Sequence, residues 1–275
     1  MQEKITVISS MEREGVKIEI LQYKNLEGGD NLSIAQQLFF AQQGGIRLKQ
    51  VKITLNNSSV ILEAGAMHFM KGNIEMDNKV GGFGGLAKKL ASSVLTKETA
   101  FKPRYSGTGE IYLEPSFAHY AIMELNNEEM IVDKGLFHCC ERSIEVGIAT
   151  QKNISSAVLG GEGFFQTQLR GSGICVLTIP VPESELIKYT LNNEKLVVDG
   201  NFALLRKGDV RFTVERTSKT LLDSWTSGEG LAQTFAGTGE VWLAPTQAVY
   251  NRIISQGIYG LSKGTGSSHT DTRKS

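Results

Sequence analysis

Hydrophobic and polar positions alternate along most of this chain, in short segments that end at glycine, asparagine or aspartate. Val16–Leu21 and Val51–Leu55 are two such segments, and alternation of this kind is typical of half-buried β-strands. Short continuous apolar runs such as Val60–Leu62 follow, and these are consistent with more deeply buried strands. The pattern predicts a protein built mainly of strands.

Two segments depart from this pattern and are expected to be helical. Residues 30–44 carry Ser33 and Gln36 at the spacing of a capping box, and Gly44-Gly45 provides a stop. Residues 86–95 have apolar residues at helical spacing after a glycine-rich segment.

Two motifs occur three times each at nearly constant spacing. Gly-Thr/Ser-Gly recurs after 64 and 66 residues, and Leu-Asn-Asn recurs after 70 and 66 residues. The glycines are Gly107, Gly109, Gly171, Gly173, Gly237 and Gly239, and the second motif begins at Leu55, Leu125 and Leu191. Self-similarity at a fixed period is the signature of a repeat architecture, so these motifs predict three units.

Other features of the units recur in the same order. Each Asn-Asn pair is interpreted as a turn, because asparagine tolerates the left-handed backbone. An apolar run, an acid and a glycine follow, and Asp199-Gly200 is typical of a hairpin. Each Gly-Thr/Ser-Gly motif then precedes a strand such as Val241–Leu243.

We therefore expect an all-β fold of three pseudo-equivalent β-rich units around a pseudo-threefold axis, with short helices. The first unit spans residues 1–115, the second 116–180 and the third 181–259, and residues 260–275 form a polar tail that is expected to be disordered. The units are expected to share a core, because each is too small to bury enough surface alone. The terminal strands, Val16–Leu21 and Val241–Leu243, are expected to occupy equivalent places and close the ring.

Composition narrows the classes of function. Lys plus Arg equals Asp plus Glu at 29 each, which argues against global attraction to nucleic acid or to an anionic membrane. The N-terminus lacks an apolar signal core, no run is long enough for a membrane helix, and three cysteines are not a disulfide framework. We expect a cytoplasmic protein.

The repeat serves as an internal control on candidate reactive residues. Cys175 matches Ile111 and Val241, and Cys139-Cys140 matches Phe69-Met70, so the cysteines are expected to be buried core residues. His68 and His138 are equivalent, but the third position is Ala203, which cannot bind a metal. We expect no metal site or cofactor, and expect both histidines to pack structurally.

The repeated glycines and acids have a structural and a functional interpretation. The glycine motifs resemble phosphate cradles, but a strand follows instead of a helix, which favours a need for special backbone geometry. Glu98, Glu162 and Glu229 recur 9, 9 and 8 residues before the glycine motif. Triplicated acids favour turn hydrogen bonds over paired-carboxylate catalysis, and we expect no enzymatic activity.

The first unit is longer than the others, and its extra residues surround Gly81, Gly82, Phe83, Gly84 and Gly85. The following amphipathic segment carries Lys88 and Lys89 on its polar side. It is expected to pack as a surface helix or to touch a partner or a membrane surface. This excursion is the expected place for a specific partner contact.

Four motifs together resemble the altered-inheritance-of-mitochondria (mitochondrial biogenesis) protein family. They are Glu63-Ala-Gly-Ala-Met67, Lys71-Gly-Asn73, Gly81-Gly-Phe-Gly-Gly-Leu86 and Gly107-Thr-Gly-Glu110, and the resemblance covers roughly residues 16–258. It implies a fold similar to the tryptophan RNA-binding attenuator class, and its eukaryotic members are linked to mitochondrial membrane organisation. It implies no enzymatic activity, cofactor or catalytic residue.

The favoured interpretation is a non-catalytic scaffold or binding protein. Its partner is expected to be a protein, with peripheral membrane contact and homo-oligomerisation left open. The first alternative is a nucleic-acid-binding protein, which the zero net charge disfavours. The second is a small-ligand or metal-binding protein that uses the threefold centre.

Overall fold

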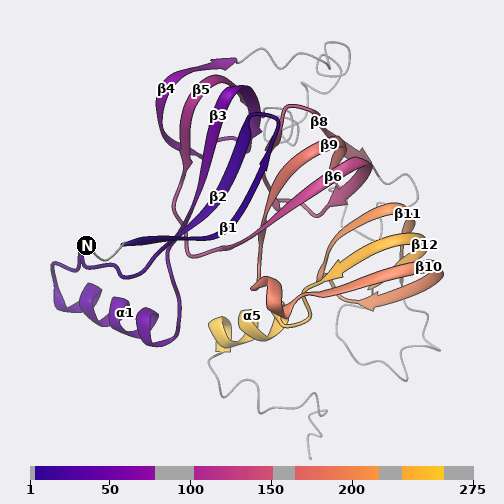
Figure 1. Ribbon diagram of the computed structural model, residues 1–275. Coiled ribbons are helices and arrows are strands. Elements are labelled where there is room, and N and C mark those ends of the chain that lie inside the picture. Colours follow the sequence, from indigo (N-terminus) through magenta and orange to yellow (C-terminus); the bar gives the residue numbers. More distant parts are fainter. Residues whose placement is uncertain (1–3, 78–101, 151–164, 217–230, 257–275) are drawn as a thin grey trace, which may run out of the picture.

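The computed structural model describes residues 4–77, 102–150, 165–216 and 231–256. Most of these residues lie in antiparallel strands, which confirms the all-β expectation (Figure 1). The strands are β1 (Ile5–Arg13), β2 (Val16–Tyr23), β3 (Lys49–Leu62), β4 (Met67–Asp77), β5 (Arg104–Leu113), β6 (His119–Val132), β7 (Phe137–Glu141), β8 (Ile144–Thr150), β9 (Phe165–Ile179), β10 (Ile187–Asp199), β11 (Ala203–Arg216) and β12 (Leu231–Leu243).

Short helices complete the described part of the chain. Helix α1 (Leu32–Gln43) was expected, but its N-cap is Asn31, whose side-chain oxygen accepts a hydrogen bond from the Ile34 amide at 3.0 Å, and not Ser33. The 3₁₀ turn η1 (Glu183–Glu185) and helix α5 (Gln247–Gln256) were not expected. The segment predicted to be helical over residues 86–95 lies outside the described residues.

Three consecutive groups of strands share one pairing order, in which the last strand in sequence lies between the other two. The central strand is β5 between β3 and β4, β9 between β6 and the pair β7 and β8, and β12 between β10 and β11. We call these groups the first, second and third triplets. The hairpin predicted at Asp199-Gly200 is therefore wrong, because β10 and β11 both pair with β12 and not with each other.

Each Asn-Asn pair lies within a long strand, so the predicted turns are wrong. Asn57, Asn127 and Asn193 have φ values of +49°, +55° and +55°, the left-handed backbone that the sequence led us to expect. Each sits at a register shift in β3, β6 or β10, where an extra residue is accommodated as a β-bulge. Asparagine is used here to bend a strand that continues on both sides.

Each bulge lies opposite a Gly-Thr/Ser-Gly motif in the central strand. The backbone amide of Asn57 donates to the hydroxyl of Thr108 at 3.0 Å. The same bond joins Asn127 to Ser172 at 2.8 Å and Asn193 to Thr238 at 3.1 Å. The two repeated motifs therefore meet in one structural feature, which each triplet contains once.

The glycines of this feature allow the neighbouring strand to come unusually close. Gly107 has φ +141°, and a Cβ atom there would lie 2.0 Å from the Asn73 carbonyl oxygen. At Gly237 the corresponding distance to the Asp209 carbonyl oxygen is 2.1 Å. The prediction of special backbone geometry is confirmed, although the motif lies inside a strand and not before one.

The triplets join edge to edge into one sheet. The path runs β1-β2-β3-β7-β9-β6-β11-β12-β10, with β4, β5 and β8 off it. Figure 1 shows three groups of curved strands in succession, with β4 and β10 in the outer groups. The predicted unit boundaries fall between β5 and β6 and between β9 and η1, and the division into domains stays a prediction.

The terminal strands do not occupy equivalent places, so that prediction is wrong. Val16–Leu21 belongs to β2, which pairs with β3 and β1. Val241–Leu243 is the end of β12, the central strand of the third triplet. The sheet path is open at both ends, and the threefold axis stays a prediction.

Three hydrophobic clusters form the core, and the junctions between triplets mix them. One cluster consists mainly of residues from β2 and the first triplet, including Ile18 and Ile53, and it also contains Cys139 and Val176 of the second triplet. Another cluster consists mainly of residues from the second triplet, and it also contains Leu205 of the third triplet. The core is thus continuous across the junctions, as the small size of each unit requires.

Replacing Gly107 with alanine should destabilise the protein by more than about 3 kcal/mol, because positive φ and a clash with backbone act together. Gly65→Ala is the matched control. Gly65 also has positive φ, but nothing lies within 4 Å of a Cβ there, so its cost should be about 1–2 kcal/mol. Urea unfolding of the two variants provides the measurement, and equal losses would contradict the role of close strand approach.

Candidate functional site

The sequence-predicted positions separate into two groups. The six motif glycines lie inside paired central strands, so they shape the sheet and do not form open phosphate loops. The other positions lie outside the described residues: Gly81, Gly82, Phe83, Gly84, Gly85, Lys88, Lys89, Glu98, Glu162 and Glu229. Their proposed roles stay predictions.

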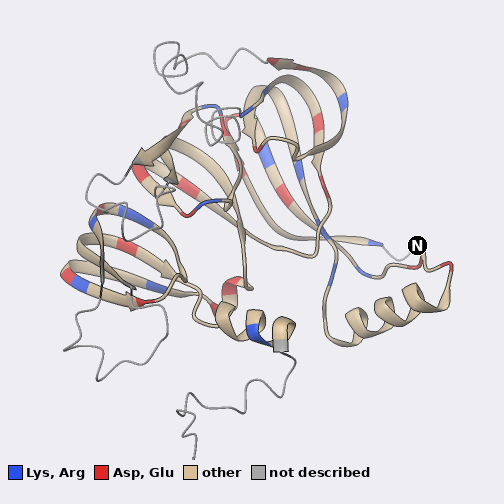
Figure 2. Ribbon diagram, turned by 180° about the vertical axis from the view of Figure 1, so that it is seen from behind, with Lys and Arg blue, Asp and Glu red and all other residues tan. Residues whose placement is uncertain are grey.

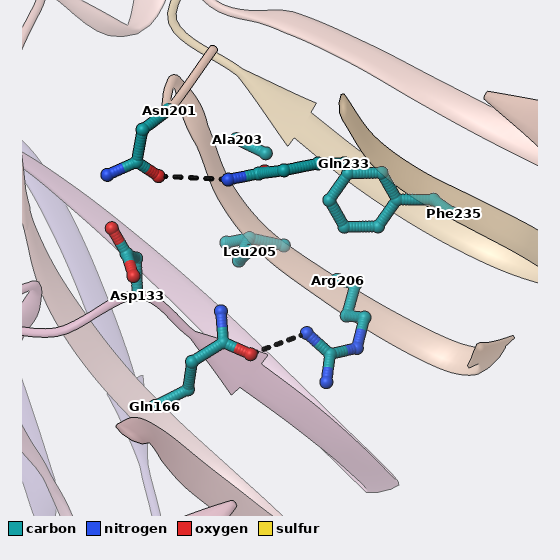
Figure 3. A pocket seen from close by; sticks show the side chains of 8 residues that line it. All are labelled: Asp133, Gln166, Asn201, Ala203, Leu205, Arg206, Gln233 and Phe235. Atoms are coloured by element: carbon teal, nitrogen blue, oxygen red, sulfur yellow. Dashed lines mark hydrogen bonds between the residues drawn. The ribbon is translucent and has the colours of Figure 1, made fainter. Parts of the chain in front are cut away.

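A polar cluster that sequence reasoning missed lies at the junction of the second and third triplets (Figure 3). Nη1 of Arg206 donates to Oε1 of Gln166 at 2.8 Å, and both side chains are buried. The Arg206 guanidinium also lies 4.9 Å from the centre of the Phe212 ring. Nearby, Nε2 of Gln233 donates to Oδ1 of Asn201 at 3.1 Å.

Burial changes the acid–base properties of this cluster. It lowers the pKa of Arg206 to about 10, with Glu129 acting in the opposite direction. It raises the pKa of the Asp133 carboxyl, which hydrogen bonds from the Lys134 backbone and the Gln166 side chain partly offset. The cavity among these residues has a volume of only about 10 Å³, which is room for one water molecule. The cluster therefore joins two triplets and has no space for a substrate.

The junction of the first and second triplets has a different polar contact at matching positions. Lys102, which corresponds to Gln166, forms an ion pair with Glu63, which corresponds to Asp133. Its ammonium also lies 5.1 Å from the centre of the Phe137 ring. In the strand pairing, Arg206 lies opposite Val241 as Cys140 lies opposite Cys175 and Met70 opposite Ile111, so these three residues are equivalent. The alignment of the repeats in the sequence, which placed Ala203 level with His68 and His138, is shifted by one residue here, so no sequence signal pointed to Arg206.

The cysteines are confirmed as buried core residues. Cys139, Cys140 and Cys175 are free thiols with no exposed surface. Burial raises all three thiol pKa values, to about 12 for Cys175. Because the thiolate is the nucleophile and the metal ligand, these cysteines are poorly suited to either role.

The two histidines differ, so the expectation for them is only partly correct. His138 packs beside Tyr120, its Nδ1 lies 3.2 Å from the Thr178 hydroxyl, and its buried Nε2 has no hydrogen-bond partner in the described residues. His68 instead lies exposed on β4, 4.0 Å from the Glu114 carboxylate. Among the described residues, no group of three His, Cys, Asp or Glu side chains could hold a metal ion.

Helix α1 presents an exposed surface that is largely apolar. It has no buried residue, and Leu32, Phe39 and Phe40 expose 89, 56 and 61% of their surface. Figure 2 shows no charged residue on α1, which projects from the strands. Leu38 and Ala41 face Ile46 and Phe117 across a cavity of about 20 Å³, and Ile46 and Phe117 are also exposed. We call the exposed residues Leu32, Phe39, Phe40, Ile46 and Phe117 the α1 surface.

Three large apolar side chains are exposed on this one helix, and gathered apolar surface is a feature of interaction sites. The α1 surface was not identified from the sequence, although the helix was. The uncharged run from Asn31 to Ile46 was the available signal. The described helices include none that is long and apolar enough to cross a membrane.

These features define an all-β protein of three similarly paired strand triplets, with an apolar helix outside the sheet. The family model for mitochondrial biogenesis AIM24 matches residues 40–246, and the chain belongs to this family. The resemblance inferred from the sequence motifs is therefore confirmed.

Two bacterial proteins are similar to this chain. An uncharacterised protein of Streptococcus pyogenes serotype M6 is 23% identical over 219 residues, which cover 76% of this chain and 86% of that protein. The crystal structure of a Streptococcus pyogenes protein is similar with a TM-score of 0.54 at 20% identity, over 76% of this chain and 94% of that one. At this identity the second similarity shows the fold alone.

The burial of His138 predicts a loss of stability in mild acid. Burial lowers its pKa from 6.5 to about 4 in the folded protein. Between these values the unfolded chain binds a proton that the folded chain does not, so stability should fall as the pH falls from 6.5 to 4. The contribution of His138 should reach up to about 3 kcal/mol at the acid end.

Urea unfolding between pH 7 and pH 4 measures this effect. His138→Gln should flatten the pH dependence. A His138→Gln variant with the same pH slope as the parent protein would contradict the assignment.

Proposed function

We propose that this protein is a non-catalytic scaffold that binds a protein partner through the α1 surface. The single observation that carries the proposal is the exposure of Leu32, Phe39 and Phe40 on a helix with no buried residue. Keeping such side chains in water is unfavourable by about 25 cal/mol per Å² of apolar surface. A partner that covers them gains this free energy.

The chemistry of α1 favours a protein over a membrane or a nucleic acid. Interfacial membrane helices use Lys and Arg on their polar face to attract anionic lipids, but the polar residues of α1 are Ser33 and glutamines. Aromatic residues are enriched, and charged residues depleted, at the centre of protein–protein interfaces. The zero net charge gives no general attraction to phosphate backbones.

The interior supports a binding role over an enzymatic one. The two cavities described above have volumes of about 10 and 20 Å³, whereas small-molecule sites occupy about 300 Å³ or more. We further propose that the three triplets are copies of one ancestral unit, because the bulge and its opposing glycines recur in each. Three buried free thiols suit a reducing compartment, and we place the protein in the cytoplasm.

The double variant Phe39→Ser/Phe40→Ser tests the proposal. Removing two exposed rings should weaken partner binding at least about tenfold without changing thermal stability, since interface aromatics often contribute more than 1 kcal/mol each. Ile254→Ser is the control, because Ile254 is an exposed apolar residue on α5. Proteins captured from the native host by the parent and by Ile254→Ser, and lost with the double variant, would be purified and titrated by calorimetry.

Two results would overturn this proposal. Flotation of the parent protein with phosphatidylcholine vesicles, abolished by the double variant, would assign α1 to membrane contact instead. Equal recovery and equal affinity of every purified partner for the parent and the double variant would exclude α1 as the binding surface.

A further inference from the structure

The two junctions between triplets use the same strand register. At the first junction Val60, Ile61 and Leu62 of β3 pair with Glu141, Cys140 and Cys139 of β7. At the second, Met130, Ile131 and Val132 of β6 pair with Lys207, Arg206 and Leu205 of β11. The β3 and β6 residues lie at the same distance from their Leu-Asn-Asn motifs, and the β7 and β11 residues lie at equivalent positions in their pairing with the central strands. An edge of the kind found in β3 and β6 therefore pairs with an edge of the kind found in β7 and β11.

The chain also carries one further edge of each kind that is not paired in the described residues. β10 is the last strand of the sheet path and pairs only with β12, and β4 pairs only with β5. The edge of β10 that is equivalent to those of β3 and β6 carries Leu196, Val197 and Val198. The edge of β4 that is equivalent to those of β7 and β11 carries Phe69, Met70 and Lys71.

Three side chains on these two edges are apolar and exposed, and the counterparts of two of them are buried. Phe69, Met70 and Val197 expose 47, 42 and 43% of their surface. Cys139, Cys140, Leu205 and Arg206, which match Phe69 and Met70, are buried at the junctions. Unpaired apolar edges are templates for strand addition, so the two edges have the composition of a junction that lacks its other half.

We infer that β10 of one molecule pairs with β4 of a second copy of this chain, in the register of the two internal junctions. Val197 would lie opposite Met70, with Leu196 opposite Lys71 and Val198 opposite Phe69. The inference is independent of the proposed role of α1. It predicts a head-to-tail assembly, which closes into a ring if the rotation permits and otherwise extends.

Charges around the edges support this register. At the second junction, Nζ of Lys207 lies 3.3 Å from Oε2 of Glu128 and 3.7 Å from Oε2 of Glu240. The equivalents of these three residues are Lys71, Glu194 and Glu110, and Lys71 already lies opposite Glu110 in β5. Pairing between molecules brings Lys71 of one copy to Glu194 of the other, which restores the same arrangement of charges.

The side chains beneath the new junction are also compatible. Gln166 and Arg206 of the second junction correspond to Ala232 and Met70. The polar cluster is thus replaced by a small and a large apolar side chain. This contact needs no buried hydrogen bonds, and it would cover surface that Met70 now exposes.

The architecture favours a second copy over closure within one chain. β4 and β10 belong to the outer triplets, and the second triplet separates them along the sheet (Figure 1). In the described structure they have no pairing with each other.

Cysteine cross-linking distinguishes pairing between two molecules from closure within one chain. Paired antiparallel residues have Cα atoms about 4.5–5.5 Å apart, which is within disulfide range. One chain with Val197→Cys and another with Met70→Cys are mixed and oxidised, and the native cysteines are too buried to compete. We expect a disulfide-linked dimer that contains one chain of each kind, whereas Tyr189→Cys mixed with Met70→Cys should give none.

Three results would overturn the inference. The first is the absence of a mixed dimer. The second is a double variant, Val197→Cys/Met70→Cys, that forms only an intrachain disulfide at monomer mass. The third is a parent protein that remains at 30.0 kDa at every concentration in analytical ultracentrifugation.

A charge exchange tests the register itself. Lys71→Glu and Glu194→Lys should each weaken self-association about tenfold, because each places like charges together. The double variant should recover the association of the parent protein. Equal weakening without recovery would show that the two residues do not meet across the interface.

Discussion

The architecture depends on the absence of a Cβ atom at a few positions in the central strands. Opposite the bulge that Asn57 forms in β3, Gly107 and Gly109 of β5 let the other neighbouring strand, β4, approach within a distance that any side chain would prevent. The bulge bends β3, so that one edge of the strand faces β2 before the bend and β7 after it. A single strand thereby belongs to its own triplet and also joins the next one. The same feature in β6 joins the second triplet to the third.

The junctions are alike in backbone pairing and different in side chains. The first contains the Lys102–Glu63 ion pair, and the second contains the Arg206–Gln166 hydrogen bond. The first contact is partly buried and the second is buried. Such contacts contribute little net stability, but an unmatched buried polar group is costly. If the third triplet took the place of the second, Arg206 would meet Lys102 and two positive charges would be buried together. The divergence of these residues therefore opposes incorrect ordering of three otherwise similar triplets.

Local patterns in the sequence predicted the strands, α1 and the left-handed asparagines, but they could not predict how the strands are ordered. A left-handed Asn57 fits both a turn and a bulge, and the choice depends on Thr108, which lies 51 residues away and accepts its amide hydrogen. The chain bends at Gly200 directly after β10, yet the strands on either side of the bend are separated by β12. Hairpin rules assume that neighbours in sequence pair, and here the third strand inserts between them. Arg206 was missed for a related reason, because its partner Gln166 comes from another triplet.

Some strand edges of the sheet are covered by neighbouring segments of the chain, whereas others are not. This difference bears on the proposed self-association. The first half of β3 is covered by β2, and Nζ of Lys52 on β3 lies 4.0 Å from Oε2 of Glu19 on β2. After the third triplet, α5 returns to η1, where Glu185 accepts hydrogen bonds from Thr246 and Tyr250. Both contacts, β2 with β3 and α5 with η1, involve short terminal or connecting segments that lie outside the repeat.

No such segment covers Val197 or Phe69 in the described structure, and no charge replaces either side chain. Natural proteins usually place charges, prolines or bulges on edges that must stay unpaired. The edges of β10 and β4 instead carry apolar residues in the register of the internal junctions. This arrangement is the one expected of edges that pair with another strand. The α1 surface offers uncharged side chains and the strand edges offer backbone groups. The two proposed contacts would therefore use different chemistry, and the two cavities described above among the described residues hold no more than a water molecule or two.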